Sequence, residues 1–138
     1  MNYVKINNSL IIDTNIIISA LLAKNKETPP KIVFNYALDD EHLFIVSKQI
    51  LYEYARVLRY KKFKFSTELI HSTIQKVYNQ GILVTSTPSN TKLKDVTDQP
   101  FYDLVTTKSA GTPTLITGNL KHFPATPFVI SPRHYLSY

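Results

Sequence analysis

The sequence contains no cysteine and no tryptophan, and only three glycines, at positions 81, 111 and 118. The absence of cysteine excludes disulfide bonds, thiolate metal sites and cysteine nucleophiles. Three isolated glycines can form neither a G-x-G-x-x-G dinucleotide-binding turn nor a Walker-type phosphate-binding loop. Several common classes of enzyme are therefore excluded by composition alone.

Long apolar runs and targeting segments are also missing. The longest apolar stretches, such as Ile16–Ile18 and Ala20–Ala23, are far shorter than a membrane span. The first residues do not combine a charged segment with a following apolar one, as a signal peptide would. We therefore expect a cytoplasmic protein with no membrane partner, and the lack of cysteine agrees with a reducing compartment.

The 138 residues are predicted to form one domain, spanning 1–138, that is large enough to bury a hydrophobic core. The net charge is +6, from 16 basic and 10 acidic residues. A basic surface favours a polyanionic partner such as nucleic acid, although the charge is equally compatible with mere solubility. With so few carboxylates in the chain, any cluster of them is informative.

Short apolar segments typical of buried strands alternate with segments of helical periodicity. We predict strands over residues 9–13, 42–46, 82–85, 114–117 and 127–130. We predict helices over residues 15–23, 31–40, 47–59, 66–80, 98–109 and 119–123, with Ser47 and Ser66 as caps. This alternation predicts an α/β fold with a parallel sheet.

The segment Leu10–Asn15 carries the strongest functional signal. Three aliphatic residues run directly into Asp13, and an apolar segment long enough for a helix follows. Asp13 is therefore expected at the carboxyl end of a strand and the amino end of a helix, where open parallel sheets bind ligands. Two roles remain open, because Asp13 could simply cap the helix or could contribute charge to a cation site.

Other polar residues fall at comparable places. Glu53 lies about two turns into a helix, Asp98 opens a later helix, Asp103 is five residues further on, and Asn119 follows a strand. The carboxyl ends of parallel strands share one edge, and Glu53 can reach that edge because helical side chains lean toward the amino end. Crowded carboxylates raise one another's pKa, and Mg²⁺ with its preference for oxygen ligands would relieve this repulsion. Each acid also has a plain alternative, as a helix cap or a solvent-exposed helix residue.

Three segments form a recognisable pattern in this order. They are LIIDTN at 10–15, SKQILYEYARVLR at 47–59, and the segment 95–124, which includes FYD at 101–103 and ITGNLKHFP at 116–124. Together they resemble the PIN domain family, nearest to the toxin components of toxin–antitoxin systems (VapC-like). The segments span nearly the whole chain, and the resemblance places Asp13, Glu53 and Asp98 as its first, second and third acids.

The resemblance implies a PIN-like three-layer α/β/α fold with a central, mostly parallel sheet of four to five strands. It implies a metal-dependent endoribonuclease, the toxin of a type II toxin–antitoxin pair, that hydrolyses RNA phosphodiesters with Mg²⁺ or Mn²⁺. The metal would be held by Asp13, Glu53, Asp98 and Asn119, with Asp103 as a supplementary catalytic acid. The residues expected to orient the carboxylates are Asn15, Ser47 and Thr117.

Asn119 departs from the family pattern, because many members have Asp at this position. Asn carries no charge, so the choice between one and two metal ions stays open. The main alternative function is a catalytically weak PIN-like module that binds nucleic acid or protein. A haloacid-dehalogenase-type phosphatase is disfavoured, because it needs a second Asp where this chain has Asn15.

Basic and aromatic residues are interleaved from position 56 to position 65. Basic side chains can follow an RNA backbone and aromatic rings can stack on unpaired bases. The residues predicted to contact RNA are Arg56, Arg59, Lys61, Lys62 and Lys121. The two arginines could instead only stabilise a helix end, Asp95 is predicted to lie in a loop, and His122 is predicted to have a structural role in a turn. The resemblance further implies a cognate antitoxin protein and is consistent with a homodimer.

Overall fold

The computed structural model of the chain describes residues 8–137. The order of its helices and strands is β1 (Ser9–Ile12), α1 (Thr14–Leu22), α2 (Pro29–Ala37), β2 (Leu43–Val46), α3 (Lys48–Leu58), α4 (Thr67–Gln80), β3 (Gly81–Leu83), α5 (Gln99–Val105), β4 (Thr114–Ile116), β5 (Val129–Ile130) and α6 (Pro132–Leu136). Short 3-10 helices occupy three connections of this described part: η1 (Lys61–Phe63), η2 (Lys108–Ala110) and η3 (Leu120–His122).

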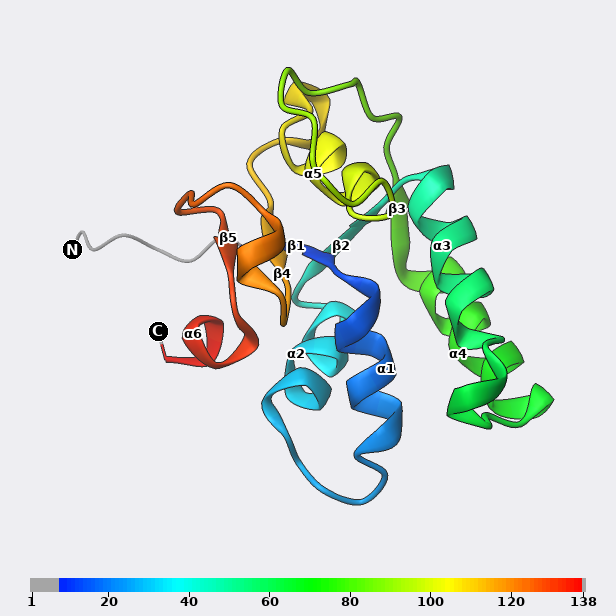
Figure 1. Cartoon of the computed structure of the whole chain (residues 1–138). Helices are drawn as coiled ribbons and strands as arrows, with labels where there is room; N and C mark the ends of the chain where they lie inside the picture. Colours follow the sequence, from blue (N-terminus) through cyan, green and yellow to red (C-terminus); the bar gives the residue numbers. More distant parts are fainter. Residues whose placement is uncertain (1–7, 138) are drawn as a thin grey trace.

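The strands form one sheet in the order β3-β2-β1-β4-β5, and each neighbouring pair is parallel. The central strand β1 is fully buried at Leu10, Ile11 and Ile12, as expected for a strand covered on both faces. Helix α2 packs against α1 and α6, whereas α3 packs against α4 and α5. Figure 1 shows α1, α2 and α6 on one side of the sheet and α5 on the other. The predicted three-layer α/β/α fold with a parallel sheet is confirmed.

Hydroxyl side chains start four of the helices. Thr28, Ser47, Ser66 and Ser131 each accept a hydrogen bond from a backbone N–H in the first turn of α2, α3, α4 and α6. Such caps satisfy amide groups that have no partner inside the helix. The predicted caps at Ser47 and Ser66 are confirmed. The helix predicted over 31–40 begins at Pro29, since proline fits the first helical position, and ends at Ala37.

Two further predicted helices are shorter than expected, and one helix was not predicted. The helix predicted over 98–109 ends at Val105, because the hydroxyls of Thr106 and Thr107 bond to carbonyl oxygens of the preceding turn and compete with further helix. The helix predicted over 119–123 is the single 3-10 turn η3. Helix α6 was missed although Ser131 and Pro132 form an ordinary start signal for a helix.

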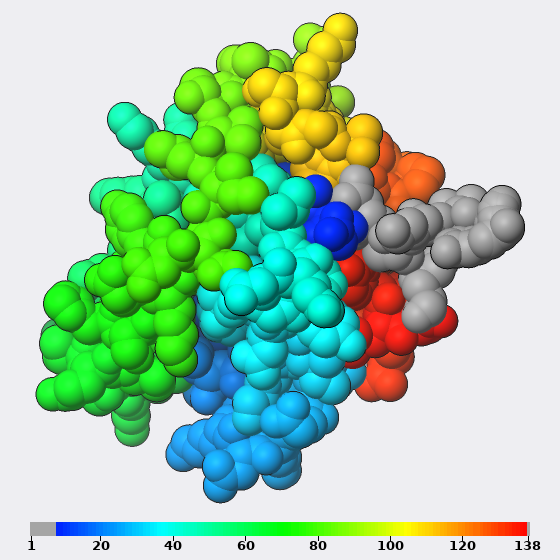
Figure 2. Space-filling view, turned by 180° about the vertical axis from the view of Figure 1, so that it is seen from behind, coloured from blue at the N-terminus to red at the C-terminus, as the bar shows by residue number. Residues whose placement is uncertain are grey.

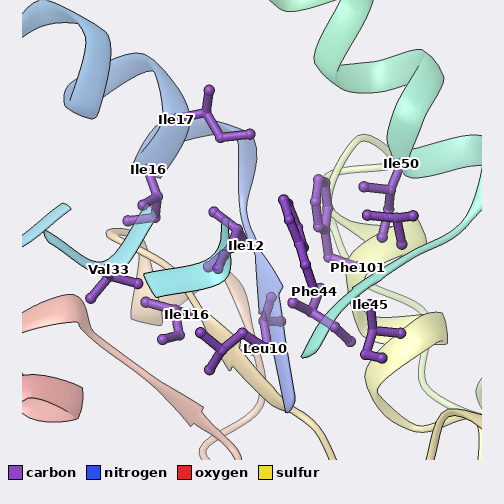
Figure 3. Close-up of a cluster of buried hydrophobic side chains, with 14 of the residues drawn as sticks. Leu10, Ile12, Ile16, Ile17, Val33, Phe44, Ile45, Ile50, Phe101 and Ile116 are labelled. Carbon is purple, nitrogen blue, oxygen red and sulfur yellow. The ribbon is translucent and has the colours of Figure 1, made fainter. Parts of the chain in front are cut away.

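Tyr54 connects α3 to the central strand. Its ring lies between Phe44 and Phe101, with ring centroids 6.4 Å and 6.2 Å away, and its hydroxyl donates to the backbone oxygen of Ile12. Figure 3 shows Phe44 and Phe101 beside Ile50 in the core. Ile12 is the last residue before Asp13, so this contact fixes α3 against the end of β1.

The surface seen from behind is formed largely by α4 and α2. Figure 2 shows α4 (green) beside α2 (blue to cyan) on this side. A groove of about 410 Å³ runs between α4 and α3, lined by apolar residues that include Leu51, Ile74 and Val77. Across residues 8–137, no helix combines the length and the apolar character needed to cross a membrane.

We predict that Tyr54→Phe lowers the free energy of unfolding by about 1 kcal/mol, because the buried Ile12 carbonyl loses a donor while the ring packing is retained. Urea unfolding followed by circular dichroism measures this change. Tyr78→Phe is the matched control, since Tyr78 is 64% exposed. Equal stability of the two variants would show that the hydroxyl of Tyr54 does not hold α3 to β1.

Candidate active site

An open cavity of about 510 Å³ collects side chains from distant parts of the chain at the carboxyl edge of the sheet. Asp13 follows β1 and Asn119 follows β4, and these strands are parallel neighbours, so their ends meet. Helix α3 adds Glu53, and the segment before α5 adds Asp98 and Asp95. The cavity therefore holds four carboxylates in a chain that has few.

Asp13 is the most buried of these acids, at 5% exposure. Its carboxylate accepts a hydrogen bond of 2.8 Å from the N–H of Thr14 and one of 2.7 Å from the hydroxyl of Thr117. Asn15 donates a longer bond of 3.4 Å. Asp13 thus caps α1, which is one of the two roles left open by the sequence, and it also joins the ends of β1 and β4.

Burial and, to a smaller extent, the charge of Asp98 raise the pKa of Asp13 from 3.8 to about 6, against the lowering effect of the Thr117 hydrogen bond. A raised pKa means that the surroundings disfavour the charged form. At neutral pH the carboxylate is still ionised, so the fold holds a buried negative charge at a free-energy cost. A cation in the cavity would offset that cost.

Asp98 lies beside a second group of potential ligands. Its carboxylate is 3.0 Å from Nδ1 of His122, which belongs to η3. The ligand atoms of Asp95, Asp98 and His122 all lie within 4.8 Å of one another. Burial raises the pKa of Asp98, and so does the neighbouring charge of Asp95. This group shares the cavity with Asp13, and the sequence had suggested neither Asp95 nor His122 as a ligand.

Glu53 reaches the cavity but is already paired. The guanidinium of Arg56 lies 2.9 Å and 3.1 Å from its two carboxylate oxygens. The hydroxyl of Tyr60 accepts a hydrogen bond from the same guanidinium. Glu53 therefore faces the other acids with its charge neutralised by its own helix, and a metal ion at this carboxylate would compete with Arg56.

The residues predicted to orient the carboxylates lie in two places. Asn15 accepts a hydrogen bond from the N–H of Gly118, and the hydroxyl of Thr117 accepts one from the N–H of Asn119. Both Asn15 and Thr117 also contact Asp13, so they hold it in place. Ser47 differs, because its hydroxyl caps α3 through Ile50 and it does not line the cavity.

The prediction that Asp103 assists the catalytic acids needs correction. Its carboxylate accepts hydrogen bonds from the N–H of Ser89 and the side chain of Gln99, and it does not line the cavity. Five residues of α-helix turn through about 500°, so Asp103 points some 140° away from Asp98. Asp103 therefore stabilises the loop before α5 and does not contribute to the acidic cavity.

The predicted RNA contacts divide between two hollows. Arg56 and Lys62 line the acidic cavity, together with the rings of Tyr60 and Phe63. Arg59 and Lys61 line a neighbouring hollow of about 450 Å³. Lys121 is exposed on η3 and lines neither.

A family model described as PIN domain matches residues 9–121. The chain therefore belongs to the PIN domain family. PIN domains are generally nucleases and typically use divalent metal ions. No match was found among the curated proteins or the solved structures compared.

The cavity residues suit a divalent cation on chemical grounds. Carboxylate oxygens are the preferred ligands of Mg²⁺ and Mn²⁺. The raised pKa of Asp13 shows that burial and the charge of Asp98 outweigh the hydrogen bonds from Thr117 and Thr14, which favour the charged form. The buried hydroxyl of Thr14, which lines the same cavity, has no hydrogen-bond partner in the described part of the chain. A hydrated cation would offset the charge of the Asp13 carboxylate, and one of its water molecules could form a hydrogen bond with the Thr14 hydroxyl.

The pKa of Asp13 predicts how metal-free stability depends on pH. Its pKa of about 6 in the folded protein exceeds the ordinary value of 3.8, so the folded protein binds more protons than the unfolded chain between these values. Stability conferred by the protonated acid is therefore lost as the pH rises through this window. We expect Asp13→Asn to remove a fall on the order of 2 kcal/mol between about pH 4 and pH 7.

Urea unfolding in EDTA at a series of pH values measures this effect. Asp40→Asn is the control, because Asp40 is exposed and lies outside the cavity. It should keep the wild-type slope of stability against pH. The same slope in Asp13→Asn as in wild type would mean that the burial of this carboxylate is not destabilising.

Proposed function

We propose that this PIN domain is a metal-dependent endoribonuclease that hydrolyses RNA phosphodiesters with Mg²⁺ or Mn²⁺. The observation that supports this most strongly is the buried, destabilised carboxylate of Asp13 in a cavity shared with Glu53 and Asp98. These three acids would hold the ion, with Asn119 beside them. A bound divalent ion polarises a phosphodiester and lowers the pKa of water.

The protein's own groups then have distinct tasks. Thr14 and Thr117 hold the carboxylate of Asp13 in one orientation. The turn before α5 presents Asp98, and the pairing with Glu53 holds the guanidinium of Arg56 in a fixed position at the cavity. A guanidinium there can bind a phosphate oxygen of the substrate. Attack by water in line with the leaving oxygen would leave a 5′-phosphate and a 3′-hydroxyl.

A stack of aromatic rings favours a single-stranded substrate. Phe63 stacks on Tyr60 at 6.3 Å and on Phe65 at 5.7 Å, measured between ring centroids. Arg56 lies 5.4 Å from the centre of the Tyr60 ring, and Lys62 lies 5.2 Å from that of Phe63. The aromatic rings at the cavity could stack on an unpaired base, and the basic side chains could bind its phosphate.

We expect Asp13→Asn to abolish cleavage of a fluorescent single-stranded RNA oligonucleotide in Mn²⁺ or Mg²⁺, by at least about a hundredfold, while the far-ultraviolet circular dichroism is unchanged. The substitution removes the charge that holds the ion. Asp40→Asn is the control and should keep wild-type activity. Full activity of purified Asp13→Asn would overturn the proposed mechanism.

We expect Tyr60→Ala to raise KM for single-stranded RNA by roughly tenfold, because one stacking contact contributes about 1–3 kcal/mol. Tyr60→Phe keeps the ring and should stay near the wild-type KM, which separates stacking from the hydrogen bond to Arg56. Tyr78→Ala serves as a control on the exposed face of α4. An unchanged KM in Tyr60→Ala would exclude the aromatic stack from the substrate surface.

We further propose that the enzyme is the toxin of a type II toxin–antitoxin pair and acts in the cytoplasm, with a cognate antitoxin protein and a second copy of itself as partners. This proposal is supported by the VapC-like segments of the sequence. We expect induced expression of the wild type to arrest bacterial growth and expression of Asp13→Asn to permit it. Equal growth of the two strains at equal protein levels would argue against a toxin.

A non-catalytic module that binds nucleic acid is the second candidate. It is favoured by the uncharged Asn119 in the cavity and by the pairing of Glu53 with Arg56, which together reduce the charge available to a cation. Tight RNA binding without cleavage in Mg²⁺, Mn²⁺ or Co²⁺ would establish this alternative. Cleavage that disappears in Asp13→Asn would exclude it.

A further inference from the structure

We propose that His122 forms, with Asp98 and Asp95, a cation subsite with one nitrogen ligand, and that this subsite makes the protein favour Mn²⁺ or Co²⁺ over Mg²⁺. The inference rests on the proposed metal-dependent function and specifies which residues choose the ion. It concerns two residues, His122 and Asp95, that the sequence pattern did not assign to metal binding.

The spacing of the three groups suits a shared ion. Nδ1 of His122 lies 3.0 Å from Oδ2 of Asp98. Two adjacent ligands at about 2.1 Å from an octahedral ion are also separated by about 3.0 Å. The ligand atoms of the whole group lie within 4.8 Å of one another, which requires a shift of only a few tenths of an ångström for ligands on opposite sides of an ion.

Two independent segments hold these side chains in place. The backbone N–H of Asp98 donates to the backbone oxygen of Asp95, so both acids sit on one turn before α5. Thr97 donates from its backbone and its hydroxyl to one carboxylate oxygen of Asp95. On the other side, His122 is fixed by the turn of η3, where its N–H donates to the Asn119 oxygen.

The pairing of His122 with Asp98 is partly open to solvent. The side chain of His122 is 46% exposed, and pairs this open to solvent contribute little to stability. The pair also leaves a second carboxylate, Asp95, close enough to raise the pKa of Asp98. The hydroxyl of Thr14, which lines the same cavity, is buried and has no partner among the described residues, so a metal-bound water would satisfy it.

The chemistry of the donors predicts the choice of ion. Imidazole binds first-row transition ions, whereas Mg²⁺ is bound mainly through carboxylates, phosphates and water. Asn119 brings no charge to the cavity, so it cannot supply the anionic ligand that an aspartate would. His122, three residues further along the same turn, supplies a donor of different character. Removing the imidazole of His122 should therefore weaken the binding of transition-metal ions more than the binding of Mg²⁺.

The test is calorimetric titration of the full chain with Mn²⁺, Co²⁺ and Mg²⁺, together with the visible absorption of bound Co²⁺. We expect His122→Ala to weaken the binding of Mn²⁺ and Co²⁺ by about tenfold or more. The binding of Mg²⁺ should weaken by less than about twofold. Asp95→Asn should weaken the binding of all three ions. His71→Ala is the matched control, because His71 is exposed on α4 and lies outside the acidic cavity.

His122→Asn is a second variant that keeps a hydrogen-bond donor for Asp98 and should show the same selective loss, with a changed Co²⁺ spectrum. Unchanged affinities in both His122 variants, or equal losses for all three ions, would overturn the subsite. These results would leave the proposed nuclease intact if the wild type still binds metal and cleaves RNA. Failure of the wild type to bind any of the three ions would overturn both proposals.

Discussion

The hydrogen bond from the hydroxyl of Thr117 to the carboxylate of Asp13 holds the site together. At 2.7 Å it joins the residues that follow the paired positions Ile12 and Ile116 of the two central strands. The same hydroxyl accepts a hydrogen bond from Asn119, so the turn into η3 is built on Asp13. One buried side chain thereby fixes where the sheet ends, where α1 begins and where the turn with His122 starts.

Charge is distributed unevenly over this fold. The chain is basic, with a net charge of +6, yet four of its ten carboxylates line one cavity. The folded chain keeps Asp13 buried although its pKa rises to about 6, and it places Arg56 and Lys62 at the same cavity. Without ligands this arrangement lowers the stability of the folded protein, and a bound cation and polyanion would offset that cost. Such a balance is expected of a functional site.

The parallel sheet and the convergence of Asp13, Glu53 and Asp98 on one cavity follow from regularities that sequence carries directly. Strands buried on both faces read as continuous apolar runs, and Ser47 and Ser66 mark helix starts. The orientation of Asp103 was not evident, because it depends on where α5 begins and on a loop that contacts it only in the folded chain. His122 and Asp95 lie 27 positions apart, so their proximity is a product of the tertiary fold.

The most direct test of this view is the anomalous diffraction of crystals grown with Mn²⁺. We expect an Mn²⁺ peak in the cavity, within about 2.0–2.4 Å of carboxylate oxygens of Asp13 or Asp98. We also expect the hydroxyl of Thr117 to remain bonded to the other oxygen of Asp13. A fully occupied Mn²⁺ site elsewhere on the surface, with none in the cavity, would contradict the claim that the buried charge of Asp13 exists to hold a cation.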